Sequence, residues 1–292
     1  MKKKIYPGIL SAFLLCLLLL AVQTVLGLML GVIQAVLHLG EDSILTGILT
    51  ILVSIISFGI VLLIGFKKTK RNFNEVFKFN GVSPILWMAV TIFSIGLVVV
   101  ISELDNLLNH VLPVPDYFRQ MFESIIGGQT FVISIIYVGI IPAIVEELFF
   151  RGLILDGFTR NYSKWKAILM SALFFGLIHL NPWQFFTGFI MGLIAAWICI
   201  ETGSILLCMF IHFFNNTIYT VMVHFKDTIS IKGFNTNFAT PVEFQPLWFT
   251  LSGLALLLVG SYMLIAGIRE SKAAEARPAE PDEPPQPDEN IS

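Results

Sequence analysis

The sequence predicts an all-α fold, a polytopic membrane helix bundle with about eight transmembrane helices. Hydrophobic residues make up 56% of the 292 positions and charged residues only 13%, whereas soluble domains carry roughly 25% charged residues. The apolar residues also form long runs, and a helix needs about 20 of them to cross a bilayer. Composition therefore excludes an ordinary soluble domain, and the lack of a basic patch with interleaved aromatic residues argues against binding to nucleic acid.

The first apolar run has basic residues before it, as a signal peptide does. It is much longer than the apolar core of roughly 7–15 residues of such a peptide, so we expect a retained membrane helix. After the third run, a segment with two prolines predicts a surface loop that contains a short interfacial helix. The expected spans are 9–36, 43–66, 83–102, 129–150, 165–181, 183–200, 204–224 and 247–267, and the loop is 102–128.

Loop charge predicts the orientation, because cytoplasmic loops carry an excess of Lys and Arg. Five basic residues lie in 67–78 and four in 151–166, whereas 103–123 carries four acidic residues and one Arg. Alternation along the spans then places both termini and the two basic loops on the cytoplasmic side of the cell membrane. The tail from Glu270, rich in Pro, Glu, Asp and Ala, is expected to be disordered because it cannot build a core.

Two adjacent carboxylates stand at membrane depth, where ionisable groups are costly and usually functional. Successive helical residues point about 100° apart, so Glu146 and Glu147 must face different directions. Glu147 lies four residues before Arg151, and the two are predicted to pair, with a purely structural ion pair as the alternative. Glu146 is left without a local cation. Pro142 lies one turn before Glu146 and has no N–H, so it is expected to kink the helix near these groups.

A histidine in the following apolar run is predicted to lie level with Glu146. If the fourth helix continues to about Arg160 and the chain turns near Tyr162, Glu146 lies 16 residues before the turn and His179 lies 17 after it. Antiparallel helices of equal rise bring two such residues to the same depth. Phe175 lies one turn before His179 on the same face. A histidine with a structural role is the alternative.

A second polar group lies in the seventh apolar run, 204–224. His212 and Asn216 share one helix face, and Asn215 is the alternative partner at three residues' spacing. Counting through turns near Pro182 and Thr202 places Asn216 within about one turn of the depth of His179, and His212 about one turn deeper. A simple hydrogen-bonded pair between helices is the alternative, worth roughly 0.6–2 kcal/mol in membranes.

A glutamate, two histidines and an asparagine in a dry cavity suit the activation of water. Glu146 can take and return a proton, and His179 can orient the water or help to deprotonate it. His212 and Asn216 can donate hydrogen bonds to an oxyanion. Glu146, His179 and His212 also form an acceptable catalytic zinc set, so spacing leaves metal chemistry open. The chain lacks Gly-x-Ser-x-Gly and His-Glu-x-x-His motifs, and its three cysteines, which lie in apolar runs, are expected to be buried hydrophobic residues.

The ordered set E-E-x-x-x-R, F-x-x-x-H and H-x-x-x-N resembles the CAAX protease and bacteriocin-processing (CPBP) family, whose bacterial members are also called Abi proteins. The motifs stand at 146–151, 175–179 and 212–216, so the resemblance covers about 129–224. It implies an intramembrane glutamic endopeptidase, a hydrolase like the type II CAAX prenyl endopeptidases, historically classed as metalloendopeptidases. It further implies roles for six residues: Glu146 and His179 as the water-activating pair, His212 and Asn216 as the oxyanion hole, and Glu147 and Arg151 in support.

The resemblance suggests four parts of the chain and two partners, the lipid bilayer and a membrane-associated peptide or protein substrate. In the glutamate mechanism that we favour, no cofactor is needed. The alternatives are a zinc-dependent form of the protease, a non-proteolytic bacteriocin-immunity or peptide-binding membrane protein, and a proton-coupled transporter. The expected parts are 1–128 with the first helices and the extracytoplasmic loop, 129–224 as the catalytic core, 225–268 with an outer loop and the last span, and the acidic tail 269–292.

Overall fold

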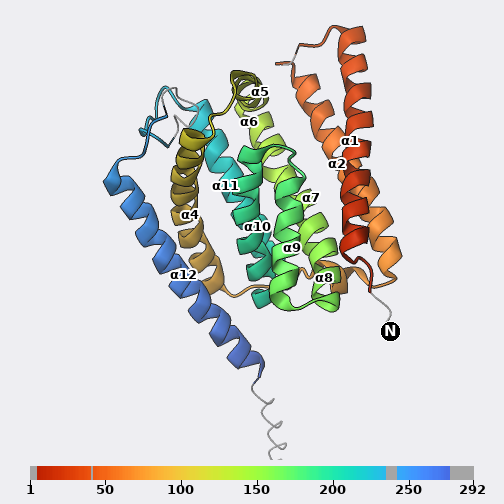
Figure 1. Ribbon diagram of the computed structural model, residues 1–292, viewed down its shortest axis with the longest axis vertical. Helices are drawn as coiled ribbons and strands as arrows, with labels where there is room; N and C mark the ends of the chain where they lie inside the picture. The colour runs from red at the N-terminus through yellow and green to blue at the C-terminus, as the bar shows by residue number, and fades with distance from the viewer. Residues whose placement is uncertain (1–4, 41, 235–241, 277–292) are drawn as a thin grey trace, which may run out of the picture.

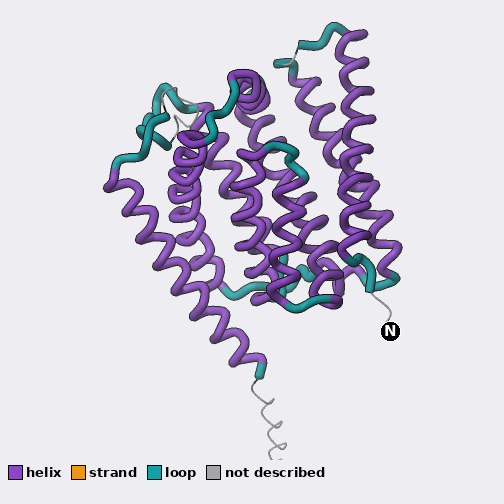
Figure 2. The backbone as a smooth tube through the Cα atoms, viewed as in Figure 1, coloured by secondary structure: helices purple, strands orange, loops and turns teal. Residues whose placement is uncertain are grey.

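The computed structural model describes residues 5–40, 42–234 and 242–276. These residues form a bundle of long helices without a β-strand (Figures 1 and 2), which confirms the predicted all-α class. Seven helices are long and apolar enough to cross a membrane, so the chain is a multi-pass membrane protein. These helices are α1 (Ile9–Leu37), α2 (Ile44–Thr69), α4 (Pro84–Val111), the composite helix Phe131–Asn161, α10 (Pro182–Thr202), α11 (Leu206–His224) and α12 (Leu247–Glu275).

The run that was expected to be the fifth span forms only a short helix. This helix, α9 (Lys164–Leu177), has 14 residues, which give a length of about 21 Å against a hydrocarbon core of about 30 Å. The chain leaves the helix there, because Leu180 adopts a left-handed conformation and Pro182 begins α10. α9 and α10 then pack side by side (Figure 1).

The third span is longer than the sequence predicted. α4 continues to Val111 instead of ending near residue 102, because the polar side chains of its last turns find partners inside the protein. The buried amide of Asn106, for example, donates to the carboxylate of Glu103 at 2.9 Å and to the carbonyl of Gly233 at 2.5 Å. The short helix predicted in the following segment is α5 (Asp116–Gly127).

The fourth span is one continuous helix made of α-helical and π-helical segments. It reaches Asn161 and is followed by a turn at Tyr162, as the depth count required. A π-helical segment ends two residues before Pro142, and π-helical turns are frequent at functional sites. The kink expected at Pro142 stays a prediction. The segments are α6 (Phe131–Ser134), η1 (Ile135–Ile140), α7 (Ile141–Glu147), η2 (Leu148–Ile154) and α8 (Leu155–Asn161).

The other long helices pack around this one and against each other. α2 lies against α7 and η2, while α1 pairs with α2 at the edge of the bundle (Figure 1). On the opposite side α12 runs along α4, where Gly96 allows the two backbones to approach. A Cβ added at Gly96 would lie 2.2 Å from the backbone nitrogen of Leu257. Small residues at such a crossing are typical of membrane helices.

The start of α1, the basic segment around α3 (Phe73–Phe77), α8 and the end of α12 all lie at one end of the bundle (Figure 1). This arrangement is the one that the predicted orientation requires, although the side of the membrane stays a prediction. α12 continues to Glu275, past the point where the tail was expected to begin. The rest of the predicted tail, 277–292, lies outside the described residues. The three cysteines are free and buried, as predicted.

Candidate active site

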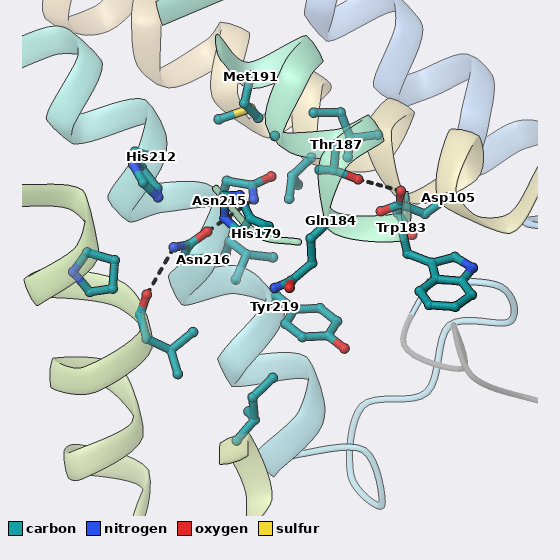
Figure 3. A pocket seen from close by; sticks show the side chains of 18 of the residues that line it. Asp105, His179, Trp183, Gln184, Thr187, Met191, His212, Asn215, Asn216 and Tyr219 are labelled. Carbon is teal, nitrogen blue, oxygen red and sulfur yellow. Dashed lines mark hydrogen bonds between the residues drawn. The ribbon is translucent and has the colours of Figure 1, made fainter. Parts of the chain in front are cut away.

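A cavity of about 530 Å³ lies between the composite helix, α4, α10 and α11. All four residues that the sequence predicts to be catalytic contribute to its wall, namely Glu146, His179, His212 and Asn216. Figure 3 shows both histidines and Asn216 near one another, with Asn215 between them. Residues from the composite helix, from the turn after α9 and from α11 therefore meet at one place, as the depth count predicted; their roles stay predictions.

The two adjacent glutamates lie in different environments. The side chain of Glu147 is 1% exposed, and its Oε1 accepts from Arg151 Nη1 at 2.9 Å. This bond confirms the predicted ion pair. Glu146 points into the cavity with 18% of its side chain exposed, and its Oε2 lies 4.0 Å from His212 Nε2. Glu146 makes no ion pair with a Lys or Arg among the residues that the structure describes.

Glu147 also holds one of the histidines. Its Oε1 accepts a second hydrogen bond, at 2.9 Å, from His212 Nδ1. A carboxylate can only accept, so Nδ1 carries the proton, and His212 turns Nε2 toward Glu146. Phe175 packs against this group, with its ring 5.6 Å from the ring of His212 and 4.1 Å from the guanidinium of Arg151. The spacing of the motifs did not reveal the bond between Glu147 and His212.

His179 lies just after the end of α9, in the turn that leads to α10. Its Nδ1 donates to the carbonyl of Phe175 at 2.9 Å, since a carbonyl oxygen can only accept. The neutral imidazole therefore keeps its lone pair on Nε2. The ring of Phe175 meets the ring of His179 edge to face, with centroids 5.6 Å apart. The ring of Phe175 thus contacts the rings of both histidines.

Asn216 reaches the composite helix through a bond that Pro142 makes available. Its amide donates at 2.9 Å to the carbonyl of Val138, four residues before Pro142, which has no N–H to offer that carbonyl (Figure 3). The oxygen of Asn216 accepts from the amide of Asn215 at 3.4 Å. A side-chain amide has two N–H groups, so one remains for a ligand in the cavity. The sequence predicted the missing N–H of Pro142 but not that Asn216 bonds to the carbonyl of Val138.

The arrangement does not fit the zinc site that spacing left open. Within the described part of the chain, no group of three or more His, Cys, Asp or Glu side chains is gathered closely enough to hold a metal ion. Glu146, His179 and His212 share the cavity without forming such a set. No step through a metal is therefore derived for this site.

The cavity has a polar region that the sequence analysis missed. Asp105 of α4 lines it, and its Oδ1 accepts from the hydroxyl of Thr187 on α10 at 2.6 Å (Figure 3). Trp183 and Gln184, from the first turn of α10, also contribute to the wall. Asp105 was expected in a surface loop because the third span was ended too early. Leu107, Leu108 and Val111 continue the helical apolar spacing and could have indicated the longer helix.

Residues 128–218 match a family model described as "Type II CAAX prenyl endopeptidase Rce1-like". No curated protein and no solved structure matches the chain. The matched segment contains the four predicted catalytic residues, Glu147 and Arg151, and it agrees with the resemblance seen in the motifs. At the level of the family, the match supports a hydrolase that acts as a membrane endopeptidase.

Proposed function

We propose, from the premise that residues 128–218 form an Rce1-like CAAX endopeptidase domain, that this protein is an intramembrane glutamic endopeptidase. Its substrate would be a membrane-associated peptide or protein. One observation carries the proposal: a carboxylate without a Lys or Arg partner among the described residues, Glu146, shares a cavity with two histidines and an asparagine. Such a site can activate water without a covalent intermediate.

Glu146 is the general base in this mechanism. It takes a proton from a water molecule that His179 Nε2 orients, and the water oxygen attacks the peptide carbonyl carbon. The C–N bond of the resulting tetrahedral intermediate breaks while Glu146 returns the proton to the leaving nitrogen. One water is consumed, and the products are a new carboxyl terminus and a new amino terminus.

Two groups then stabilise the oxyanion of the intermediate. The remaining N–H of Asn216 is one donor, and Nε2 of His212 is the other. His212 donates from Nε2 only as an imidazolium, because Nδ1 already donates to Glu147. The carboxylates of Glu146 and Glu147 favour this charged form, and the charges of Glu146, Glu147, Arg151 and His212 then sum to zero. Preorganised donors of this kind are each worth about 10²–10³ in rate.

The test compares membrane peptidomes of cells that produce the wild type or a Glu146→Gln variant. We expect cleavage products of at least one membrane peptide to disappear in the variant, with a loss of at least about 100-fold for the purified enzyme. Glu75→Gln is the matched control, because the Glu75 side chain is 52% exposed and neither Glu75 nor its partner Arg71 lines the cavity. Near-normal cleavage by Glu146→Gln would overturn the mechanism.

The same preparations separate the alternatives. A zinc-dependent protease would contain stoichiometric zinc and lose its activity with a chelator, whereas the glutamate mechanism predicts neither result. An immunity or peptide-binding protein would retain its cellular phenotype in a Glu146→Ala variant.

A further inference from the structure

Asp105 is a carboxylate in the cavity wall that the proposed reaction does not use. One of its oxygens accepts the hydroxyl proton of Thr187 at 2.6 Å, and this is its only hydrogen bond or ion pair among the described residues. Oδ2 is therefore available to a ligand in the cavity. A hydrogen bond between two helices does not need a charge, since an asparagine oxygen would accept equally well. An acid in a membrane helix is costly and usually functional.

The place of Asp105 relative to the reaction follows from its partner. Thr187 precedes Gly188, and a Cβ added at Gly188 would lie 3.5 Å from Cε1 of His179. Neighbouring Cα atoms are 3.8 Å apart, and an extended peptide advances by about 3.3–3.6 Å per residue, so the carboxylate lies within roughly three substrate residues of the scissile bond. Figure 3 shows the Asp105–Thr187 pair on one side of the cavity and His179 beside it.

The charges around the cavity favour a cation. Two carboxylates, Glu146 and Asp105, line it, and none of its described wall residues is a Lys or an Arg. In the proposed mechanism the charge of Glu146 is balanced within its group of four residues, which leaves the negative charge of Asp105 without a balancing cation. The nearby guanidinium of Arg151 is buried and bonded to Glu147, and the ring of Phe175 covers it. A substrate group with a positive charge would therefore find a partner in this cavity, and a second anion would not.

We propose that Asp105 is a specificity-determining residue that binds a Lys or Arg side chain of the substrate within about three positions of the cleaved bond. This inference rests on the proposed endopeptidase function. It selects, among membrane-associated peptides, those with a basic residue beside an apolar segment. Asp105 makes an ion pair with the basic side chain, while Thr187 holds the carboxylate in place.

The probe is a set of membrane-anchored peptides that differ only by Lys, Gln or Glu, placed in turn at each of the positions around a central bond. The full-length protein is reconstituted in vesicles. Cleavage by the wild type is followed by mass spectrometry, and binding is measured with Glu146→Gln, which requires no turnover. We expect the best Lys peptide to exceed its Gln counterpart by at least about tenfold in kcat/KM and in affinity. Asp105→Asn can keep the bond to Thr187. In this variant the Lys-to-Gln ratio of kcat/KM should fall below about threefold, and so should the ratio of affinities when the substitution is combined with Glu146→Gln.

Asp116→Asn is the matched control, because it makes the same chemical change at an exposed carboxylate paired with Arg119, and it should leave the ratios unchanged. Cleavage without a preference for Lys, or a preference that survives in Asp105→Asn, overturns the subsite and leaves the proposed function standing. A Lys preference in binding that depends on Asp105, without cleavage of any peptide, overturns the proposed function and supports the subsite. If the peptides show no preference in binding and none of them is cleaved, both the subsite and the proposed function are overturned.

Discussion

Replacing Glu147 by Gln should strongly destabilise the protein, because Glu147 lies in a buried ion pair. Glu147 and Arg151 are each 1% exposed in their side chains, and 2.9 Å separates the bonded atoms. The same carboxylate oxygen accepts from His212 at 2.9 Å. The substitution keeps an oxygen acceptor and nearly the same volume, so its effect isolates the charge.

The magnitude follows from burial. Two unit charges 2.9 Å apart attract with about 6 kcal/mol at an effective dielectric constant of about 20. Part of this attraction only offsets the cost of removing both groups from water, but a variant that loses one charge leaves the other buried without compensation. Removal of one partner from a buried pair costs about 3–5 kcal/mol. Because Gln can still accept from Arg151, we expect the lower end, about 3 kcal/mol.

The assay is a double-mutant cycle by equilibrium unfolding in mixed detergent micelles. The variants are Glu147→Gln, Arg151→Met and both together. The double variant should be less destabilised than the sum of the single ones, with a coupling energy of at least about 1.5 kcal/mol, because Met leaves no buried charge to compensate. Additive effects within about 0.5 kcal/mol, or a cost below about 1 kcal/mol for Glu147→Gln, would refute the reasoning.

Two further predictions concern the backbone. Pro142→Ala restores an N–H that competes with Asn216 for the carbonyl one turn earlier; we expect a folded protein with about tenfold slower peptide cleavage, equal to about 1.4 kcal/mol, and an unchanged rate would contradict the role of this bond. Gly96→Ala places a Cβ 2.2 Å from the backbone of Leu257 and should cost about 1–3 kcal/mol in the same unfolding assay. Gly59→Ala, at a position with no atom within 4 Å, should be neutral or stabilising and serves as the control.

Features that depend on neighbours along the chain could be read from the sequence. Apolar runs of bilayer length predicted the all-α class and most of the helices, because every backbone group must be paired within the membrane and a helix does this locally. The ion pair of Glu147 and Arg151 is equally local. The predictions for the length of α9 and for the end of α4 were wrong, since a helix end depends on which polar groups find partners elsewhere.

Only the tertiary structure decided which groups bond across helices. The bond of His212 to Glu147 joins residues 65 apart, and the bond of Asn216 to the carbonyl of Val138 joins residues 78 apart. Counting helical turns brought these residues to a common depth, but depth does not say which way a side chain rotates or which atoms it meets. The same limit kept Asp105 out of the predicted site, because its place in the cavity depends on the packing of α4 against α10.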